Sequence, residues 1–567
     1  MSFRLTSSEL ALALAAMAGP ALADVTPEQV WQSWLDYYRA VGYSVTEGGR
    51  AQAGDTLTVS DVVLTGGADQ ERVTIRVPKA VLSGQDDGKV RTVLSDRISV
   101  DIEGTEPDAG TYAVPLTVEM AGNSVLSSGA PQDMTHSFDY PTLDFVLTAI
   151  TSKGKETPLP MRFDLAGATG DLHVVAGAPA RYDYRMKAER LSFQGKVPDE
   201  AGGHVGFEGK VDGLKSEGNL VLPSSVERIA EDLGAALGAG LDMGGQVEAG
   251  PMDATFEFDT RDEAGQPSSG TGSYEGKGWN ATFALSQKGL VYRIGTDGLK
   301  MQVSSPQMPF PISYAMTGAS FDMQLPVLQQ DTPQPFKFAY DLSGVTLGDE
   351  IWNLFDPQKT LPRDPASLVV DVTGLMRVTR DLFTPPPPAT QEAGTEDSGA
   401  DGTGDSAKAD GADATPPADA TDDATADGMA QGAPADDAEA EAEAGADQDS
   451  MAAQTAEPSP FEPVEVAINR VALDMLGAKI RANGNLHAPE GGAMTTPVGK
   501  IHAEYDGVNG LLDKLIQLGL VAQDQASGLR MMLAMFAKPA AEGTDRLVSD
   551  IEFTEDGRIL ANGQPIQ

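Results

Sequence analysis

The sequence predicts a mostly β protein of the α+β class, with one large, strongly twisted antiparallel sheet and a few helices packed on it. Three observations lead to this fold class. Short runs of residues alternate between apolar and polar side chains along most of the chain, as in antiparallel strands that pack on one side. The 62 Gly and 37 Pro residues supply turns for many short strands. Strands and helices do not alternate along the chain, which disfavours a doubly wound parallel sheet.

The alternating runs start near Leu57 and recur up to the C-terminus. In the run from Ile98 to Ile102, apolar residues alternate with Ser99 and Asp101. Asp556-Gly557 lies between two runs and predicts a final hairpin. The runs leave open whether the sheet stays open as a trough or closes into a barrel. Comparable runs occupy residues 57–64, 73–77, 143–150, 161–165, 182–193, 255–258, 282–285, 321–325, 336–342, 464–475 and 498–505.

Three segments, 27–41, 224–237 and 510–537, have the spacing of amphipathic helices. In the first, Thr26 and Gln29 predict a capping box, with a proline in the first turn. Its two tryptophans are interpreted as a core face docked on the sheet; the alternative is a ligand cleft. Segment 224–237 should pack on the sheet or close one end of it, with a lid over a cavity as the alternative. Segment 510–537 should form two helices that separate at Gly519.

Residues 1–23 have the pattern of a secretory signal peptide. Arg4 precedes an apolar stretch from Leu10 to Met17, and Ala21-Leu22-Ala23 supplies a cleavage site. Cleavage after Ala23 would place the mature chain in the periplasm. No later segment approaches the ~20 apolar residues that a membrane-spanning helix needs. The chain contains no cysteine, which excludes disulfides, thiol catalysis and cysteine-ligated metals.

The composition divides the chain into four parts: the signal peptide 1–23, a β-rich part 24–383, an acidic insertion 384–460 and a second β-rich part 461–567. From Ala389 to Pro460 the chain has nineteen Asp and Glu residues against Lys408, a net charge of −18, which leaves −26 of the total of −44 for the rest. Without aromatic residues, Val, Ile or Leu, this tract is expected to be a disordered, solvated insertion; the alternative is recruitment of cations or basic partners. Such a charge disfavours nucleic-acid binding.

No catalytic, cofactor-binding or metal-binding residue is predicted. The chain has neither an HExxH motif nor a GxSxG elbow. Gly270-Thr271-Gly272 lacks the spacing of a phosphate loop and suits a hairpin better. Carboxylates paired in space for acid–base chemistry stay open as an alternative. The five histidines are scattered along the chain: His136, His173, His204, His487 and His502.

The densest run of large apolar residues, prolines and paired charges is 347–374. We expect Asp349 to cap a short helix whose Ile351, Trp352, Leu354 and Phe355 pack on the sheet. The prolines should then force an extended path into a strand at 368–372, and Arg363 should pair with Asp364 or Asp356. An architectural role is favoured over an active-site loop. The signature residues are Trp352, Phe355, Asp356, Pro357, Pro362, Arg363, Asp364 and Pro365.

Three parts of the chain resemble the bacterial domain of unknown function 2125 family. They are Pro27-Glu28-Gln29-Val30-Trp31 with Tyr37-Tyr38 and Gly42-Tyr43, the block Trp352-Asn353-Leu354-Phe355-Asp356-Pro357 with Leu361-Pro362-Arg363-Asp364-Pro365, and the C-terminal helices with Asn562-Gly563. This resemblance implies no activity and no catalytic residue. The ending, with Asn483-Gly484-Asn485-Leu486 and Pro497-Val498-Gly499-Lys500-Ile501, is similar to AsmA-like envelope proteins. That similarity implies a long, curved sheet that cradles lipid.

The leading functional hypothesis is a non-enzymatic periplasmic protein of the cell envelope that binds lipid or another apolar ligand along the sheet. The alternative is a scaffold that binds envelope proteins through the acidic insertion and the sheet edges. A hydrolase of envelope polymers comes third.

Overall fold

The computed structural model describes residues 24–67, 71–106, 110–199, 202–224, 232–261, 265–383, 459–490, 492, 494–541 and 543–566. The described residues belong to one compact unit. The signal peptide, the acidic tract 384–458 and residues 225–231 of one expected helix lie outside the described residues.

Strands make up 65% of the structure and helices 11%, with one antiparallel sheet of 28 strands among the described residues. The predicted fold class is therefore confirmed. The helices are α2 (Pro27–Ala40), α3 (Leu233–Gly238), α4 (Asp349–Phe355), α5 (Val508–Gln517) and α6 (Gln523–Phe536). The strands are β1 (Ser44–Ala53), β2 (Thr56–Gly66), β3 (Glu71–Gly84), β4 (Val90–Leu94), β5 (Arg97–Glu106), β6 (Gly110–Glu119), β7 (Ser124–Ala130), β8 (Asp133–Ser152), β9 (Lys155–Val175), β10 (Ala180–Pro198), β11 (His204–Leu222), β12 (Asp242–Ala249), β13 (Met252–Arg261), β14 (Pro267–Gly276), β15 (Trp279–Ser286), β16 (Gly289–Thr296), β17 (Leu299–Ser304), β18 (Ile312–Met316), β19 (Gly318–Leu325), β20 (Gln330–Leu347), β21 (Ala366–Val378), β22 (Phe461–Met475), β23 (Ala478–His487), β24 (Val498–Asp506), β25 (Lys538–Pro539), β26 (Arg546–Phe553), β27 (Ile559–Ala561) and β28 (Gln564–Pro565).

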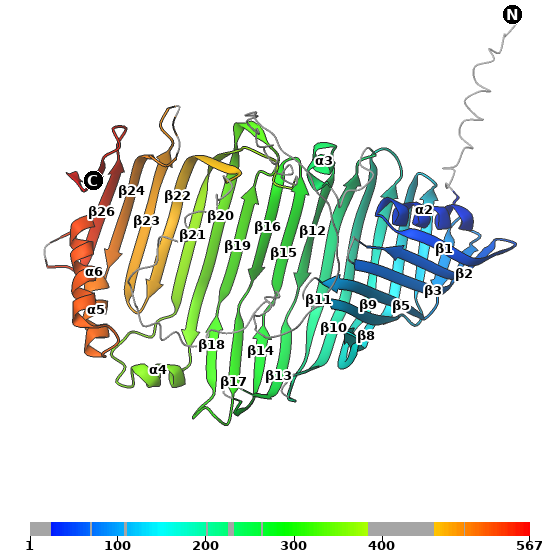
Figure 1. The fold of residues 1–567 in the computed structure, drawn as a ribbon, viewed down its shortest axis with the longest axis horizontal. Coiled ribbons are helices and arrows are strands. Elements are labelled where there is room, and N and C mark those ends of the chain that lie inside the picture. The colour runs from blue at the N-terminus through cyan, green and yellow to red at the C-terminus, as the bar shows by residue number, and fades with distance from the viewer. Residues whose placement is uncertain are drawn as a thin grey trace, which may run out of the picture. The chain divides into compact units, whose positions relative to one another are not determined.

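The strands lie side by side almost in chain order (Figure 1). Between the long strands β11 and β20 the sheet consists of two rows of shorter strands. One row is β12, β15, β16 and β19, and the other is β13, β14, β17 and β18. Both rows end on β20. The chain thus crosses the sheet repeatedly by short turns, as the density of Gly and Pro predicted.

A line of bulge-like irregularities crosses the strands from β1 to β20, and we call it the crease. At most of its positions one residue on each of two facing strands stays unpaired while the register is unchanged; at Gly344 the register also shifts. Backbone hydrogen bonds continue across the crease, for example from Gly250 N to Asp212 O at 2.9 Å and from Lys277 N to Gly298 O at 3.0 Å. Six of its residues have φ between +50° and +149°, a region that mostly glycine adopts. Bulges bend a strand and increase its twist. The crease residues are Gly48, Asp61, Pro78, Pro141, Gly167, Glu189, Gly213, Gly250, Gly278, Gly298, Thr317 and Gly344.

The extra residue at the crease shifts the alternation of each strand by one position. As a result, the apolar side chains stay on one face of the sheet along the whole strand. In β2, Leu57 and Val59 lie before the crease, and Val62 and Leu64 lie after it. All four are buried in the same core beneath α2.

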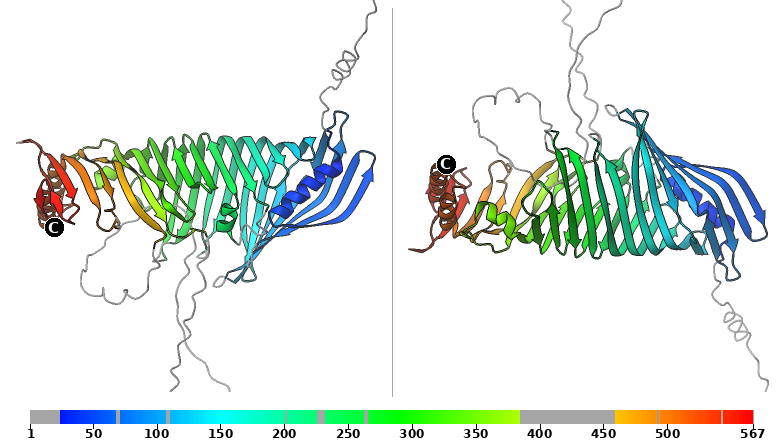
Figure 2. Two further views of the ribbon diagram at one scale, coloured as in Figure 1. Left: turned by 90° about the horizontal axis from the view of Figure 1, so that it is seen from above. Right: turned by 90° about the horizontal axis from the view of Figure 1, so that it is seen from below.

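Helix α2 forms as the sequence predicts. Thr26 and Gln29 make the capping box, with bonds of 2.9 and 3.3 Å. Val30, Trp31 and Leu35 are buried against the first strands, so the interpretation of this helix as a docked core helix is confirmed. Figure 2 shows α2 along the inner side of the curve that these strands make.

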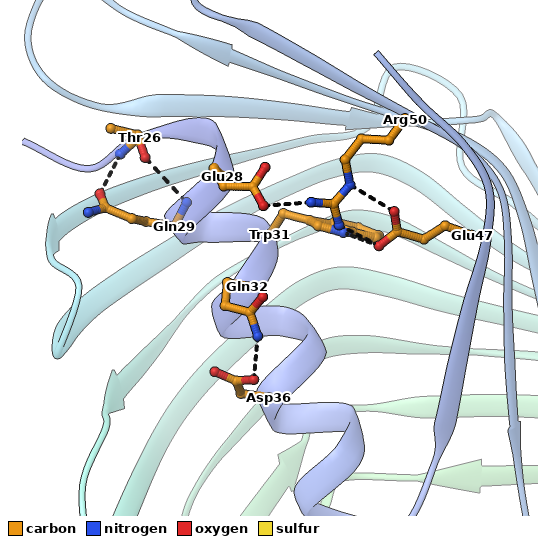
Figure 3. A network of polar contacts seen from close by, with 8 residues as sticks. All are labelled: Thr26, Glu28, Gln29, Trp31, Gln32, Asp36, Glu47 and Arg50. Atoms are coloured by element: carbon orange, nitrogen blue, oxygen red, sulfur yellow. Dashed lines mark hydrogen bonds and ion pairs between the residues drawn. The ribbon is translucent and has the colours of Figure 1, made fainter. Parts of the chain in front are cut away.

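Ion pairs join α2 to the edge strand β1 (Figure 3). Trp31 Nε1 donates to Glu47 at 2.8 Å, and Arg50 pairs with Glu47 and Glu28, each at 2.6 Å. The hydrogen bonds from Arg50 lower the pKa of the Glu47 carboxyl from its ordinary value. The helix is therefore held by polar contacts at its rim as well as by its apolar face.

The other helices also lie on the sheet. Within the described residues, the helix expected at 224–237 begins at Leu233 and packs in a second core through Ala236 and Leu237. At the C-terminal end, Ser549 and Asn562 bind the last turn of α6 through Phe536 O, at 2.6 and 2.9 Å. In Figure 1, α2 lies at one end of the sheet and the pair α5–α6 at the other.

Candidate functional site

The signature residues form a corner between β20 and β21. Two expectations about the polar contacts of this corner are wrong. The cap of α4 is Gly348, not Asp349, because the backbone is already extended at Gly348. Arg363 pairs with Asp349 at 2.5 Å rather than with the carboxylate of Asp364 or Asp356. Its guanidinium lies 5.3 Å from the Trp352 ring and donates to the backbone oxygen of Asp356 at 2.9 Å.

Asp356 holds this corner together. Its carboxylate is buried and accepts bonds from the backbone amides of Thr360 and Leu361, both at 2.8 Å. Burial would raise the pKa of Asp356, but the bonds from Leu361 and Thr360 and the charge of Arg363 together lower it. The Asp356 carboxylate thus accepts hydrogen bonds from two amides that have no backbone acceptor in the turn. Its role is structural.

The remaining signature residues complete the corner. Trp352 is buried and its ring lies 5.3 Å from that of Phe355, but Leu354 is 65% exposed and does not pack on the sheet as expected. Pro357 follows α4, and Asp364-Pro365 leads directly into β21. Pro362 lies against Gly477, where an added Cβ would come within 2.9 Å of its ring. These contacts support an architectural role.

The sheet face on which α2 lies is a more extensive candidate, and we call it the apolar face. Directly paired residues share a face, so the register follows this face from strand to strand. One row begins at His136, which contacts Trp34 of α2, and continues through Leu172, Tyr184, Gly218, Gly245, Phe283, Tyr292, Met323, Phe338, Val372 and Ile468. Beyond the crease, a second row contains Phe145, Phe163, Phe193, Gly209, Ala254, Tyr274, Met301, Tyr314 and Leu347.

Neither row contains Asp, Glu, Lys or Arg. The opposite face, which we call the polar face, is charged: one of its rows contains Asp171, Arg185, Glu217, Gln246, Thr282, Arg293 and Asp322. Lys337 of β20 reaches Asp322 from the next row, at 2.8 Å. Two-sided strands of this kind normally bury their apolar face in a core.

Much of the apolar face is not buried. Neither of the two cores around α2 and α3 contains any residue of the second row. Exposed apolar patches of this extent are rare on soluble proteins, and they usually mark a binding surface. Ten side chains of this face between β10 and β20 are 37–42% exposed: Tyr184, Val197, Val205, Phe283, Tyr292, Ile294, Ile312, Tyr314, Phe338 and Leu347.

Glycines and aromatic rings lie next to each other on this face. Phe207 covers Gly195 and Phe256 covers Gly272, where an added Cβ would come within 2.4 and 2.1 Å of the ring. Because the glycine leaves room, the ring can lie flat across the neighbouring strand. Half-exposed rings therefore cover much of this face, and its polar groups in the two rows are tyrosine hydroxyls and the His136 ring, without any carboxylate, ammonium or guanidinium.

The polar face carries a shallow groove of about 920 Å³ across β8 to β17. At its rim Arg162 pairs with Asp144 and Asp164 at 2.7 and 2.5 Å. Burial and the nearby Asp164 raise the pKa of Asp144. Arg162 neutralises two carboxylates on neighbouring strands. We interpret this arrangement as a cross-strand contact that stabilises the sheet.

Two further findings concern the described residues alone. No group of three or more His, Asp or Glu side chains within them is placed to hold a metal ion. None of their helices combines the length and the apolar content that crossing a bilayer requires.

Sequence reasoning did not find the two rows of the apolar face, and it found only part of the strands, missing for example β11 and β16. The signal was present: at Gly167 and Gly213 the alternation shifts by one residue within a single strand. A shift of this kind indicates a bulge rather than the end of a strand.

Comparisons with protein-family models, with curated proteins and with solved structures found no match.

Proposed function

We propose that this protein is an exported, periplasmic protein of the cell envelope that holds lipid acyl chains along its apolar face. One observation carries the proposal: a continuous, uncharged and half-exposed apolar surface extends over the strands between α2 and the α5–α6 pair. Its export rests on the N-terminal signal pattern. The resemblance of the C-terminal sequence to envelope proteins that cradle lipid agrees with this proposal.

The chemistry of the face favours acyl chains over a polar ligand. It offers aromatic and aliphatic side chains and no charge, so the gain on binding comes from removing apolar surface from water, about 25 cal/mol per Å². A polymer hydrolase of the usual kind would need a pair of carboxylates that converge on a bond, and the two rows of the apolar face contain no Asp or Glu.

The first experiment measures lipid on the chain purified after export. Native mass spectrometry should detect bound phospholipid in the wild type. Phe283→Asp combined with Phe338→Asp should reduce the bound lipid at least about tenfold, since each change puts a charge into the apolar contact. Both side chains are about 40% exposed, so the fold should tolerate the changes.

The matched control places the same charges on the polar face, by Thr282→Asp and Ser320→Asp. Both are polar-face positions on β15 and β19, and this variant should keep its lipid. Wild-type protein without lipid, or equal loss of lipid in both variants, would refute the proposal.

A further inference from the structure

Helix α6 exposes the most prominent apolar surface among the described residues. Leu529, Met531, Met532 and Met535 are 44%, 71%, 54% and 57% exposed, and we call them the α6 patch. Each of these exposed fractions is larger than that of any of the ten exposed side chains of the apolar face, of which Phe338 has the highest, 42%. Flexible, polarisable methionines adapt to irregular apolar partners.

Charge is sparse along α6: its charged residues are Asp524 in the first turn and Arg530. From Ser527 to Phe536 the only charged residue is Arg530. Its guanidinium donates to Asp513 at 2.5 Å and to Asn509 O at 3.3 Å, both on α5. The charge of Arg530 is thereby turned towards α5, and the second half of α6, from Ser527 to Phe536, has no other charged residue.

The orientation of α6 is fixed. Ala526 is fully buried on its inner side, and Ser549 and Asn562 hold its last turn on the sheet. Ser549 belongs to the apolar face, because its row continues through Ala503 and Ala482. The α6 patch therefore points outward at the C-terminal end of the apolar face.

The size of the patch limits what can cover it. A stable protein interface uses roughly 20–30 residues on each side, far more than these four. A bilayer needs only side chains that insert among its acyl chains.

We propose that the α6 patch docks the protein on the surface of a lipid bilayer, by insertion of the methionine side chains. The inference rests on the proposed function, since a protein that holds acyl chains must meet the membrane they come from. It adds the place of contact, at the end of the apolar face opposite α2.

The net charge of the chain determines how this docking depends on lipid charge and on salt. The total is −44, so anionic membranes repel the protein and only the apolar contact attracts it. Binding to neutral phosphatidylcholine vesicles should therefore be insensitive to salt. Binding to vesicles containing phosphatidylglycerol should be weaker and recover as salt screens the repulsion.

Vesicle flotation of the purified chain tests this directly. Met532→Ser combined with Met535→Ser should lower the bound fraction on phosphatidylcholine vesicles at least about tenfold, because two inserted apolar side chains are lost. The control is Leu354→Ser on α4, which removes an apolar side chain that is 65% exposed, more than either methionine, and should float like the wild type. All three proteins share one N-terminus, so residues 1–23 contribute equally.

The same samples separate this inference from the proposed function. Native mass spectrometry should find the same bound lipid in the α6 variant as in the wild type. Flotation that depends on the α6 patch in a protein without lipid would support docking and refute lipid holding. Docking is overturned if the wild type does not float, if the α6 variant floats equally well, or if light scattering shows that the patch instead forms a dimer.

Discussion

His136 lies on β8 beneath α2, with its ring 6.1 Å from that of Trp34. Its Nδ1 is 2.8 Å from Ser127 Oγ, and its Nε2 is buried without a hydrogen-bond partner among the described residues. Its paired neighbours Ser127 and Leu172 carry no charge. Burial therefore lowers the pKa of His136 from 6.5 to about 4, because no neighbour stabilises the imidazolium.

This pKa predicts a loss of stability in acid. The unfolded chain binds a proton at His136 below about pH 6.5, whereas the folded chain does so only near pH 4. Stability is thus complete above pH 6.5 and falls as the pH drops towards 4, by about 2 kcal/mol at pH 5. Urea unfolding at pH 7 and pH 5 should show this loss in the wild type and a smaller one in His136→Leu.

His502 provides a control with the opposite sign. Its hydrogen bond with Asp550 raises its pKa above 6.5, so its contribution is present in acid and lost as the pH rises through that higher value. His502→Gln should therefore steepen the fall of stability towards pH 5. An unchanged pH dependence in His136→Leu would contradict the assignment.

At the scale of elements, the crease decides how the strands are shaped. Gly298 has φ +117°, and an added Cβ would come within 2.8 Å of Met316 O and 2.9 Å of Thr317 O. Gly213 also has positive φ, +70°, but nothing lies within 4 Å of its added Cβ. An alanine at Gly213 would therefore suffer only the backbone strain of a positive φ, whereas an alanine at Gly298 would also clash with backbone oxygens.

Gly298→Ala should destabilise the protein by about 3 kcal/mol, from left-handed strain plus the contact with backbone oxygens that cannot move freely. Gly213→Ala should cost only about 1 kcal/mol, from the strain alone. Chemical denaturation of both variants measures the difference. Equal costs would show that the crease is not tightly packed at β17.

The elements also show what sequence patterns can predict. The capping box at Thr26 was predictable because it joins residues three apart. The partner of Arg363 was not, since Asp349 is fourteen residues away and the corner that unites them forms only when β20 and β21 pair. The prediction that Leu354 packs on the sheet was wrong for a similar reason. The residue spacing shows that α4 is amphipathic, but it does not show how much of the helix the sheet covers.

At the scale of the whole molecule, the sheet separates charge from apolar surface over its full width. The apolar face gains free energy from any apolar layer that covers it. Because a ligand that binds only the folded chain stabilises it, lipid occupancy and stability are linked.

Removing bound lipid should therefore lower the melting temperature. Adding a single-chain phospholipid back at about 100 times its dissociation constant should restore about 2.7 kcal/mol. Thermal unfolding during such a titration measures the effect, and an apolar fluorescent dye should bind the stripped protein and be displaced by lipid. A melting temperature that does not change when lipid is added would argue against binding of lipid to the apolar face.

The sequence by itself determined many of the strands, the antiparallel class, the capping of α2 and the pair α5–α6, because each depends on neighbours a few residues apart. Only the tertiary structure decided that the bulges of successive strands align into one crease, that the apolar residues form one uncovered face, and that α6 turns its methionines outward. Those properties depend on register between strands and on which helices reach the sheet. Alternation along one strand gives the two faces, but only the paired strands show that one face stays open.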